Sequence, residues 1–169
     1  MRYPADYWIK TLGLSPHTEG GAFRRVYASG IRIPQAHLPD SFHGSRPSSS
    51  AIYFLLEKGQ ISALHRIASD ELWHFYYGDP LEIYEIDLRG KLTRSMLGND
   101  PENNESFQHL VKGGHWFGAK VKGDGDYSLV GCTVSPGFDF EDFELGRRED
   151  LIRQYPAHET VIRMLTLSQ

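Results

Sequence analysis

The middle of the chain is a succession of short, β-prone segments, and this pattern limits the possible folds more than any other feature. The segments are Ala51 to Leu56, Gln60 to Ile67, Glu71 to Tyr77, Leu81 to Asp87, Lys91 to Leu97, Ser106 to Val111, His115 to Val121 and Tyr127 to Val134. Turn sequences such as Gly123-Asp124-Gly125 separate them, and no helical pattern intervenes. Short strands without crossover helices argue against βαβ units and predict an all-β sandwich or barrel.

Both ends of the chain show helical patterns. Pro4 suits the first turn of a helix and Gly13 suits a C-terminal stop, so one short helix is predicted over residues 4–12. Residues 147–155 and 157–165 predict two more helices, separated at Pro156. We expect residues 1–169 to form one domain, because the length suits a single core and no internal repeat is present.

Two segments lie outside this regular pattern. Residues 30–50 contain Pro, Ser and His without a clear period, and they predict a long loop with one extended piece at residues 31–33. Such a loop often forms a lid or an arm that reaches a partner chain, and disorder is the alternative. Farther on, Phe138, Phe140 and Phe143 are interspersed with acidic residues, which predicts an edge strand with one solvated face.

Charge and composition exclude several classes of protein. The formal net charge is −4 and there is no basic run, so nucleic acid is not an expected partner. The sequence has neither a signal-peptide pattern nor an apolar run long enough for a membrane, which predicts a cytoplasmic protein. The single cysteine, Cys132, sits in an apolar run, which predicts a buried thiol rather than a nucleophile.

The stretch from Gly59 to Gly78 carries the clearest chemical signal. Gly59, His65, Glu71 and Gly78 have the spacing of the first conserved motif of the cupin superfamily, which this stretch resembles. In that motif a second histidine stands two residues after the first, where this chain has Ile67. The resemblance therefore predicts an inward-facing His65 and Glu71 with one of the usual partners replaced.

The second cupin motif would fall at residues 111–117. Gly114 matches its second glycine, but its proline position is Lys112 and its metal-binding histidine position is Phe117. His115 is close by but out of register with the motif. Only half of the usual ligand positions of a cupin metal site are therefore occupied by donor side chains.

The whole chain also resembles one branch of that superfamily, an uncharacterised family known as cupin type 5, a domain of unknown function. The matching phrases are Tyr7-Trp8-Ile9, Glu19-Gly20-Gly21, Ser50 to Leu56, His65-Arg66, Asp70 to His74 and Ser135 to Glu141. The resemblance implies a double-stranded β-helix, that is, an RmlC-like jelly-roll barrel, and a homodimer formed by exchange of N-terminal strands. It implies no settled activity. The characterised relatives in fold are the metal-free dTDP-sugar 3,5-epimerases and the seed storage proteins.

A metal site would need more ligands than the two motifs supply. Three protein ligands are the minimum for a defined zinc or non-haem iron site, and only His65 and Glu71 occupy cupin ligand positions. Strand alternation turns His74 outward if Glu71 points inward, whereas it makes His115 point the same way as Phe117. We therefore predict no cofactor. A divalent metal at His65 and Glu71, with His115 as a spare ligand, is the weaker alternative.

Without a metal, His65 and Glu71 can form an acid–base pair, because a carboxylate orients an imidazole and stabilises its charged form. The expected ligand-binding residues are Trp73, Phe75, Phe117, His115, Tyr53 and Tyr84, whose aromatic walls would suit a carbohydrate or nucleotide sugar. We thus expect a small-molecule-binding protein, and an epimerase or isomerase that uses His65 as acid and base is the enzymatic form of this hypothesis. The alternatives are a metal-dependent oxygenase or isomerase, a binding protein without catalysis and a structural dimer module. The remaining histidines, His17, His37, His43, His109 and His158, are expected at the surface.

Overall fold

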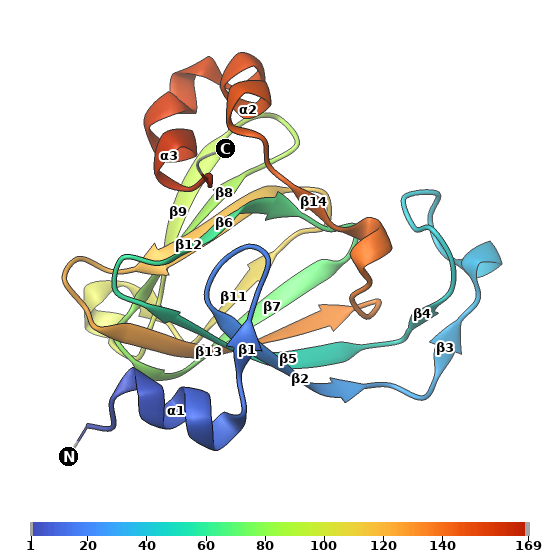
Figure 1. Cartoon of the computed structure of the whole chain (residues 1–169). Coiled ribbons are helices and arrows are strands. Elements are labelled where there is room, and N and C mark those ends of the chain that lie inside the picture. The colour runs from blue at the N-terminus through green and yellow to red at the C-terminus, as the bar shows by residue number, and fades with distance from the viewer. Residues whose placement is uncertain (1, 168–169) are drawn as a thin grey trace.

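The computed structural model describes residues 2–167, and its strands form two six-stranded sheets that face one another (Figure 1). The first sheet has the order β1 (Ser15–Pro16), β2 (Ala22–Ala28), β5 (Ser50–Glu57), β13 (Tyr127–Ser135), β7 (Asp70–Gly78) and β11 (Gln108–Val111). The second has the order β10 (Glu105–Ser106), β9 (Leu92–Leu97), β8 (Leu81–Ile86), β12 (Trp116–Val121), β6 (Ile61–Arg66) and β14 (Glu144–Leu145). The prediction of an all-β jelly roll is confirmed.

Strand alternation decides which side chains fill the space between the sheets. β13 pairs with β5 and with β7, and its register sets Cys132 opposite Ile52 on one side and Trp73 on the other. Directly paired residues share a face of the sheet, so all three point inward. Phe54 and Phe117 complete the centre of this core. Cys132 is 2% exposed, which confirms the predicted buried thiol.

Helices cover the outer faces of both sheets (Figure 1). On the first sheet lies α1 (Ala5–Leu12), and its Trp8 packs into an apolar cluster with Leu55. On the second sheet lie α2 (Arg148–Gln154) and α3 (Glu159–Met164), and they pack Leu151 and Ile162 into a cluster with Trp116. All three predicted helices are confirmed. Within the described residues, no helix has the length and apolar character that crossing a membrane would require.

The segment over residues 30–50 forms an arm that stands out from the sandwich (Figure 1). Two short strands, β3 (Arg32–Ile33) and β4 (Arg46–Pro47), pair antiparallel along it, and a 3-10 helix covers Gln35–His37. The extended piece expected at residues 31–33 corresponds to β3. The chain crosses from the arm directly into β5, so the arm is anchored where the first sheet begins.

The edge strand predicted over the phenylalanine-rich segment is wrong for most of its length. Phe140–Asp142 form a 3-10 helix, and only Glu144–Leu145 pair with β6. The Asp139 carboxylate accepts the backbone N–H of Glu141 at 3.0 Å, and this local hydrogen bond favours a turn over a strand. Phe138 and Phe143 both pack against the core between the sheets.

Candidate functional site

A pocket opens between the sheets where β2, β5, β13 and β7 of the first sheet meet β6 of the second. Its polar lining consists of His17, Glu19, Arg25, Ser50, His65, Glu71 and Cys132, and its apolar lining of Phe23, Ile52, Val134, Phe138 and Phe140. About 50 Å³ of the space is open to water-sized molecules, which is room for a few waters. The pocket therefore joins titratable groups to apolar walls in a small volume.

His65 stands at the centre of the titratable groups. It lies on β6 opposite Phe117 of β12, and the two rings are 4.1 Å apart between centroids. Its Nδ1 is 2.7 Å from the Ala63 carbonyl oxygen, so this nitrogen carries the proton and donates it. The other ring nitrogen, Nε2, is 3.1 Å from Oε2 of Glu19. The direct partner of His65 is therefore Glu19.

Glu19 is held in place by the loop between β1 and β2. Its carbonyl oxygen accepts the Ala63 N–H at 2.8 Å, and its Oε1 accepts the Ser62 hydroxyl at 2.8 Å. The next residue, Gly20, has φ of 110°, and a Cβ there would lie 2.1 Å from the Ile61 carbonyl oxygen. Only glycine allows the loop to approach β6 this closely. The glycine is therefore what places Glu19 beside His65.

Burial sets the protonation of this pair. Glu19 is 6% exposed, and burial raises the pKa of its carboxyl group to about 7 against the influence of His17 and Ser62. Burial also lowers the pKa of His65, with Glu71 and the Ala63 carbonyl acting in the opposite direction. Both shifts favour the neutral forms, so in the protonated pair the proton resides on Glu19 and is donated to Nε2, and it is partly lost near neutral pH.

A second carboxylic acid faces the same pocket. Glu71 on β7 is 7% exposed, and burial raises the pKa of its carboxyl group to about 7. The neighbouring Glu19 also raises this pKa, whereas His65 and a hydrogen bond with Cys132 lower it. Burial likewise raises the pKa of the Cys132 thiol, and Glu71 raises it further, so the thiol stays protonated. Glu19 and Glu71 thus both titrate near neutral pH within one pocket.

His17 adds a second imidazole, and the prediction that it lies at the surface is wrong. Its side chain is 8% exposed because the β1–β2 loop folds inward, and its ring packs edge-on against Phe23. The Glu19 backbone N–H donates to its Nδ1 at 3.3 Å, so a neutral His17 carries its proton on Nε2. Burial lowers the pKa of His17 despite the neighbouring Glu19.

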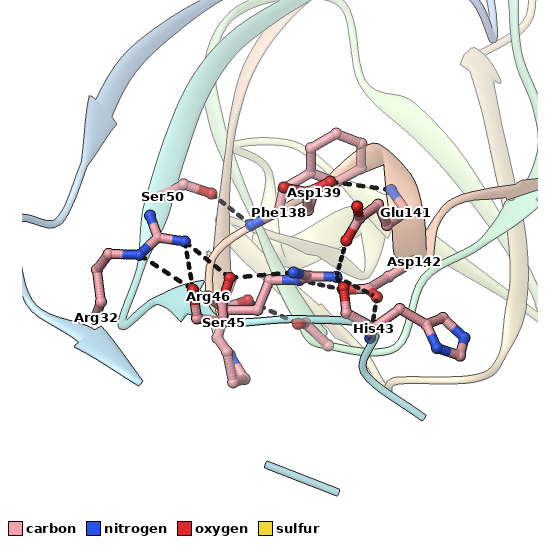
Figure 2. A network of polar contacts seen from close by, with 11 residues as sticks. Arg32, His43, Ser45, Arg46, Ser50, Phe138, Asp139, Glu141 and Asp142 are labelled. Atoms are coloured by element: carbon pink, nitrogen blue, oxygen red, sulfur yellow. Dashed lines mark hydrogen bonds and ion pairs between the residues drawn. The ribbon is translucent and has the colours of Figure 1, made fainter. Parts of the chain in front are cut away.

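Figure 2 shows how a buried ion pair fixes the aromatic wall of the pocket. Arg46 on β4 is 1% exposed, and its guanidinium donates to both carboxylate oxygens of Asp142 at 2.6 Å. Asp142 belongs to the same 3-10 helix as Phe140, and the Phe138 N–H donates to the Ser50 hydroxyl at 2.9 Å. The arm and the pocket wall are therefore coupled through this bidentate contact, to which the His43 N–H adds a hydrogen bond to Asp142 at 3.2 Å.

The sequence matches the family model described as Cupin superfamily (DUF985) over residues 6–146. The chain belongs to this family. Among solved structures, a protein from Shewanella oneidensis is 43% identical, with a TM-score of 0.87 and a match that covers 99% of each chain. A hypothetical protein from Leishmania major is 36% identical, with a TM-score of 0.89, and the match covers 98% of this chain and 100% of that chain.

A more distant likeness links this cupin to oxalate decarboxylase from Bacillus subtilis. The identity is 15% and the TM-score 0.55, and the match covers 91% of this chain and 37% of that chain. At this identity the likeness concerns the fold alone. No protein of curated function matches this sequence.

The cupin ligand positions can now be compared with the pocket. His65 and Glu71 both line it, whereas Ile67 and Phe117 carry no donor atom and belong to the apolar core. Within residues 2–167, no group of three or more His, Cys, Asp or Glu side chains is arranged to hold a metal ion. Both ring nitrogens of His65 are also engaged by protein groups. The donor set therefore does not fit a cupin metal.

The expected aromatic walls are distributed differently from the prediction. Trp73 and Phe117 belong to the core that supports the pocket, and Phe75 packs against that core. Tyr53 lies on the outer face of its sheet with Trp8 of α1, and Tyr84 lies beneath the C-terminal helices. The expectation that Tyr53 and Tyr84 line the pocket is thus corrected, because helices cover the faces on which they lie. Phe23, Phe138 and Phe140 supply the aromatic wall instead.

His115 and His74 both lie away from the pocket. His115 Nδ1 is 2.5 Å from one carboxylate oxygen of Glu85, and His109 Nε2 is 3.3 Å from the other. His109 is 20% exposed, so it is not the surface histidine that was expected. His74 contacts the Thr133 hydroxyl at 3.0 Å, in agreement with the predicted outward orientation. His115 is therefore not a spare ligand for His65.

Sequence reasoning missed Glu19 and His17 as site residues. Glu19-Gly20-Gly21 was part of the family resemblance, and its two glycines were the available signal for a close approach of the backbone. What the motif spacing could not supply is the loop's contact with β6, which joins residues more than forty positions apart.

Proposed function

We propose that this cupin binds a small polar molecule in the pocket and moves a proton on it with the His65–Glu19 pair and Glu71. The observation that supports this most is the direct contact of His65 Nε2 with Glu19 beside a second acid of raised pKa. Groups that titrate near the working pH are the effective general acids and bases. The favoured ligand class remains carbohydrate, including nucleotide sugars.

The pocket contains both groups that such a proton transfer needs, one to remove a proton and one to return it. One group removes a proton from a carbon beside a carbonyl, and the other donates a proton to the resulting enolate, so no oxidant, reductant or metal takes part. The His65–Glu19 pair acts as one unit whose proton sits on Glu19 or on Nε2, and Glu71 acts as the second group. Two acids with pKa values of about 7 suit these opposite roles, because each is partly protonated at neutral pH.

The pocket volume limits what can react. About 50 Å³ open to water accommodates one small polar group, so a sugar would enter by one edge of its ring while the rest stays outside. Phe140, which is 53% exposed, is the part of the wall best placed to move aside. The apolar walls exclude bulk water and strengthen the electrostatic contacts inside.

The test is solvent deuterium exchange. The protein is incubated in D2O with a panel of keto sugars and smaller carbonyl compounds, and loss of the proton beside the carbonyl is followed by NMR. We expect at least one compound to exchange, and His65→Gln to slow this exchange by about 100-fold or more. His115→Gln is the matched control and should stay within twofold of the wild type, because His115 contacts Glu85 outside the pocket.

Exchange by no compound, or equal exchange by wild type and His65→Gln, would contradict proton transfer. Binding of a sugar without exchange would identify the protein as a binding module, which is the runner-up. That alternative is consistent with the family match, because the family description assigns no activity.

We also propose a second copy of this chain as a partner, through exchange of N-terminal strands. β1 pairs with β2 only at Ala22 and Phe23, so the rest of β2 is a free sheet edge within the described residues. Val26, Tyr27 and Ile31 on and after this edge are 44%, 52% and 73% exposed. An edge of this kind is a template for pairing with another chain. Native mass spectrometry should give twice the chain mass, and a monomer at micromolar concentration would contradict the proposal.

A further inference from the structure

Arg25 is a cation in the pocket wall that has no partner within the described part of the chain. It lies on β2, where its register partner is Ile52 and where Phe23, two residues earlier, shares its face. Both neighbours line the pocket, and so does Arg25. Its guanidinium forms no hydrogen bond, ion pair or ring contact with residues 2–167, and the residue is exposed.

The other arginines make this exception informative. Arg46 and Arg66 pair with carboxylates, and Arg24, the neighbour on the opposite face of β2, lies over the Tyr53 ring. Further contacts to carboxylates, hydroxyls or carbonyls occupy Arg2, Arg32, Arg94, Arg147, Arg148, Arg153 and Arg163. Besides Arg25, only Arg89, in an exposed turn, has a side chain without an ion pair, a hydrogen bond or a ring contact among the described residues.

We propose that Arg25 binds an anionic group of the ligand, a carboxylate or a phosphate, so that the substrate is a small anionic carbonyl compound. This inference rests on the proposed function and specifies its substrate class. A guanidinium recognises both anions through parallel N–H donors. An unpaired cation beside the apolar side chains Phe23 and Ile52 is suited to that task.

The order of groups through the pocket agrees with such a molecule. Arg25 is exposed at the mouth, whereas His65, Glu19 and Glu71 are at most 7% exposed. An anion at the mouth would therefore leave the carbonyl end of the ligand directed toward the acid–base groups. Glu19 and Glu71 carry raised pKa values, so near neutral pH they repel an anion less than two ionised carboxylates would.

The test compares charged probes with uncharged analogues of similar shape. The ¹⁵N-labelled full chain is titrated with lactate against lactamide, and with glycerol 3-phosphate against glycerol, while amide shifts are followed by NMR. We expect at least one anion to shift signals of pocket residues and to bind at least tenfold more tightly than its uncharged analogue. The lactate arm and the phosphate arm distinguish a carboxylate from a phosphate ligand.

Two variants locate the effect. Arg25→Gln should weaken binding of that anion by tenfold or more, and Arg24→Gln, the matched control on the opposite face, should stay within twofold. Anion binding that is unchanged in Arg25→Gln, or no binding of either anion, would overturn the inference. Its failure is distinguishable from failure of the proposed function, because His65-dependent exchange of an uncharged ketose such as dihydroxyacetone would uphold the latter alone.

Discussion

Two carboxylate–histidine clusters lie in this cupin, and the same residue types have opposite properties in them. In the pocket, burial raises the pKa of Glu19 to about 7 and lowers that of His65. Away from the pocket, burial also acts to raise the pKa of Glu85, but hydrogen bonds with His109 and His115 outweigh it and the pKa is lowered. Each carboxyl group faces two imidazoles, since Glu19 Oε2 is 3.1 Å from His65 Nε2 and 3.7 Å from His17 Nδ1. The difference is that hydrogen bonds with two histidines outweigh the burial of Glu85, whereas burial is the larger influence on Glu19.

This comparison supports the proposal that the pocket cluster, rather than the Glu85 cluster, takes part in proton transfer. The Glu85 carboxylate is hydrogen-bonded by a histidine on each oxygen, which holds it in its charged form. Its contact with His109 joins β8 to β11 and indicates a structural role. A carboxylic acid that titrates near neutral pH can exchange its proton with a ligand. The roles proposed for His65, Glu19 and Glu71 therefore depend on their burial as much as on their identity.

The largest expected effect on stability comes from breaking the buried ion pair between Arg46 and Asp142, which holds the aromatic wall of the pocket. Arg46→Met leaves the Asp142 carboxylate, which is 4% exposed, without its partner and should lower the free energy of unfolding by about 3–5 kcal/mol. Chemical denaturation measures this loss. Arg153→Met is the control, because its pair with Asp150 is exposed and contributes at most about 1 kcal/mol. Equal effects of both substitutions would show that the wall is held by other contacts.

The pocket cluster depends on a close backbone approach at Gly20, whereas the Glu85 cluster does not. Gly20→Ala places a Cβ against the Ile61 carbonyl at a backbone angle that L-residues rarely adopt, so it should cost roughly 2–3 kcal/mol and slow deuterium exchange through displacement of Glu19. Gly30→Ala is the control, since nothing lies within 4 Å of a Cβ there. Neither substitution should disturb the contacts of Glu85, which sits in a regular strand. An unchanged exchange rate in a folded Gly20→Ala protein would contradict the role of Glu19.

The pH dependence of stability should have opposite signs for acids of the two clusters. The pKa of Glu71 rises from an ordinary 4.5 to about 7 on folding, so its contribution to the free energy of unfolding falls as pH rises from about 4.5 to 7. Glu71→Gln removes this fall, and the variant should gain about 2–3 kcal/mol relative to wild type between pH 5 and pH 8.

Glu85→Gln should behave in the opposite way. The lowered pKa of Glu85 stabilises the folded protein above the ordinary carboxyl pKa, and this stability is lost as pH falls through the folded value. The variant should therefore be about 1–2 kcal/mol less stable than wild type at pH 7, and the difference should vanish in acid. Thermal unfolding from pH 3 to pH 8 measures both variants, and slopes of the same sign would remove the distinction between the clusters.

Most of the fold could be predicted from local pattern, because turn spacing and strand alternation are properties of neighbouring residues. Alternation also placed Glu71 and Trp73 on the inner face of β7 and His74 on the outer face. It failed for Tyr84, since β8 is buried on both faces and the pattern cannot tell the core from the side covered by helices. The phenylalanine-rich segment became a 3-10 turn because Asp139 binds a nearby backbone N–H.

The candidate site was only half predictable. His65 and Glu71 followed from motif spacing, but the direct partner of His65 comes from a loop more than forty residues away. His17 and Glu19 precede the motif, and only the docking of the β1–β2 loop on β6 brings them to it. The raised pKa values of Glu19 and Glu71 depend on burial in the folded protein, so a local sequence pattern could not predict them.

The most direct test of the central claim is the titration of single side-chain carboxyl groups by ¹³C NMR, with glutamate-labelled protein and assignments from Glu19→Gln and Glu85→Gln. The account predicts that the Glu19 carboxyl signal titrates with a pKa of about 7 and the Glu85 signal below the ordinary value of 4.5. A Glu19 pKa at or below 4.5 would contradict the acid–base pair on which the proposed function depends.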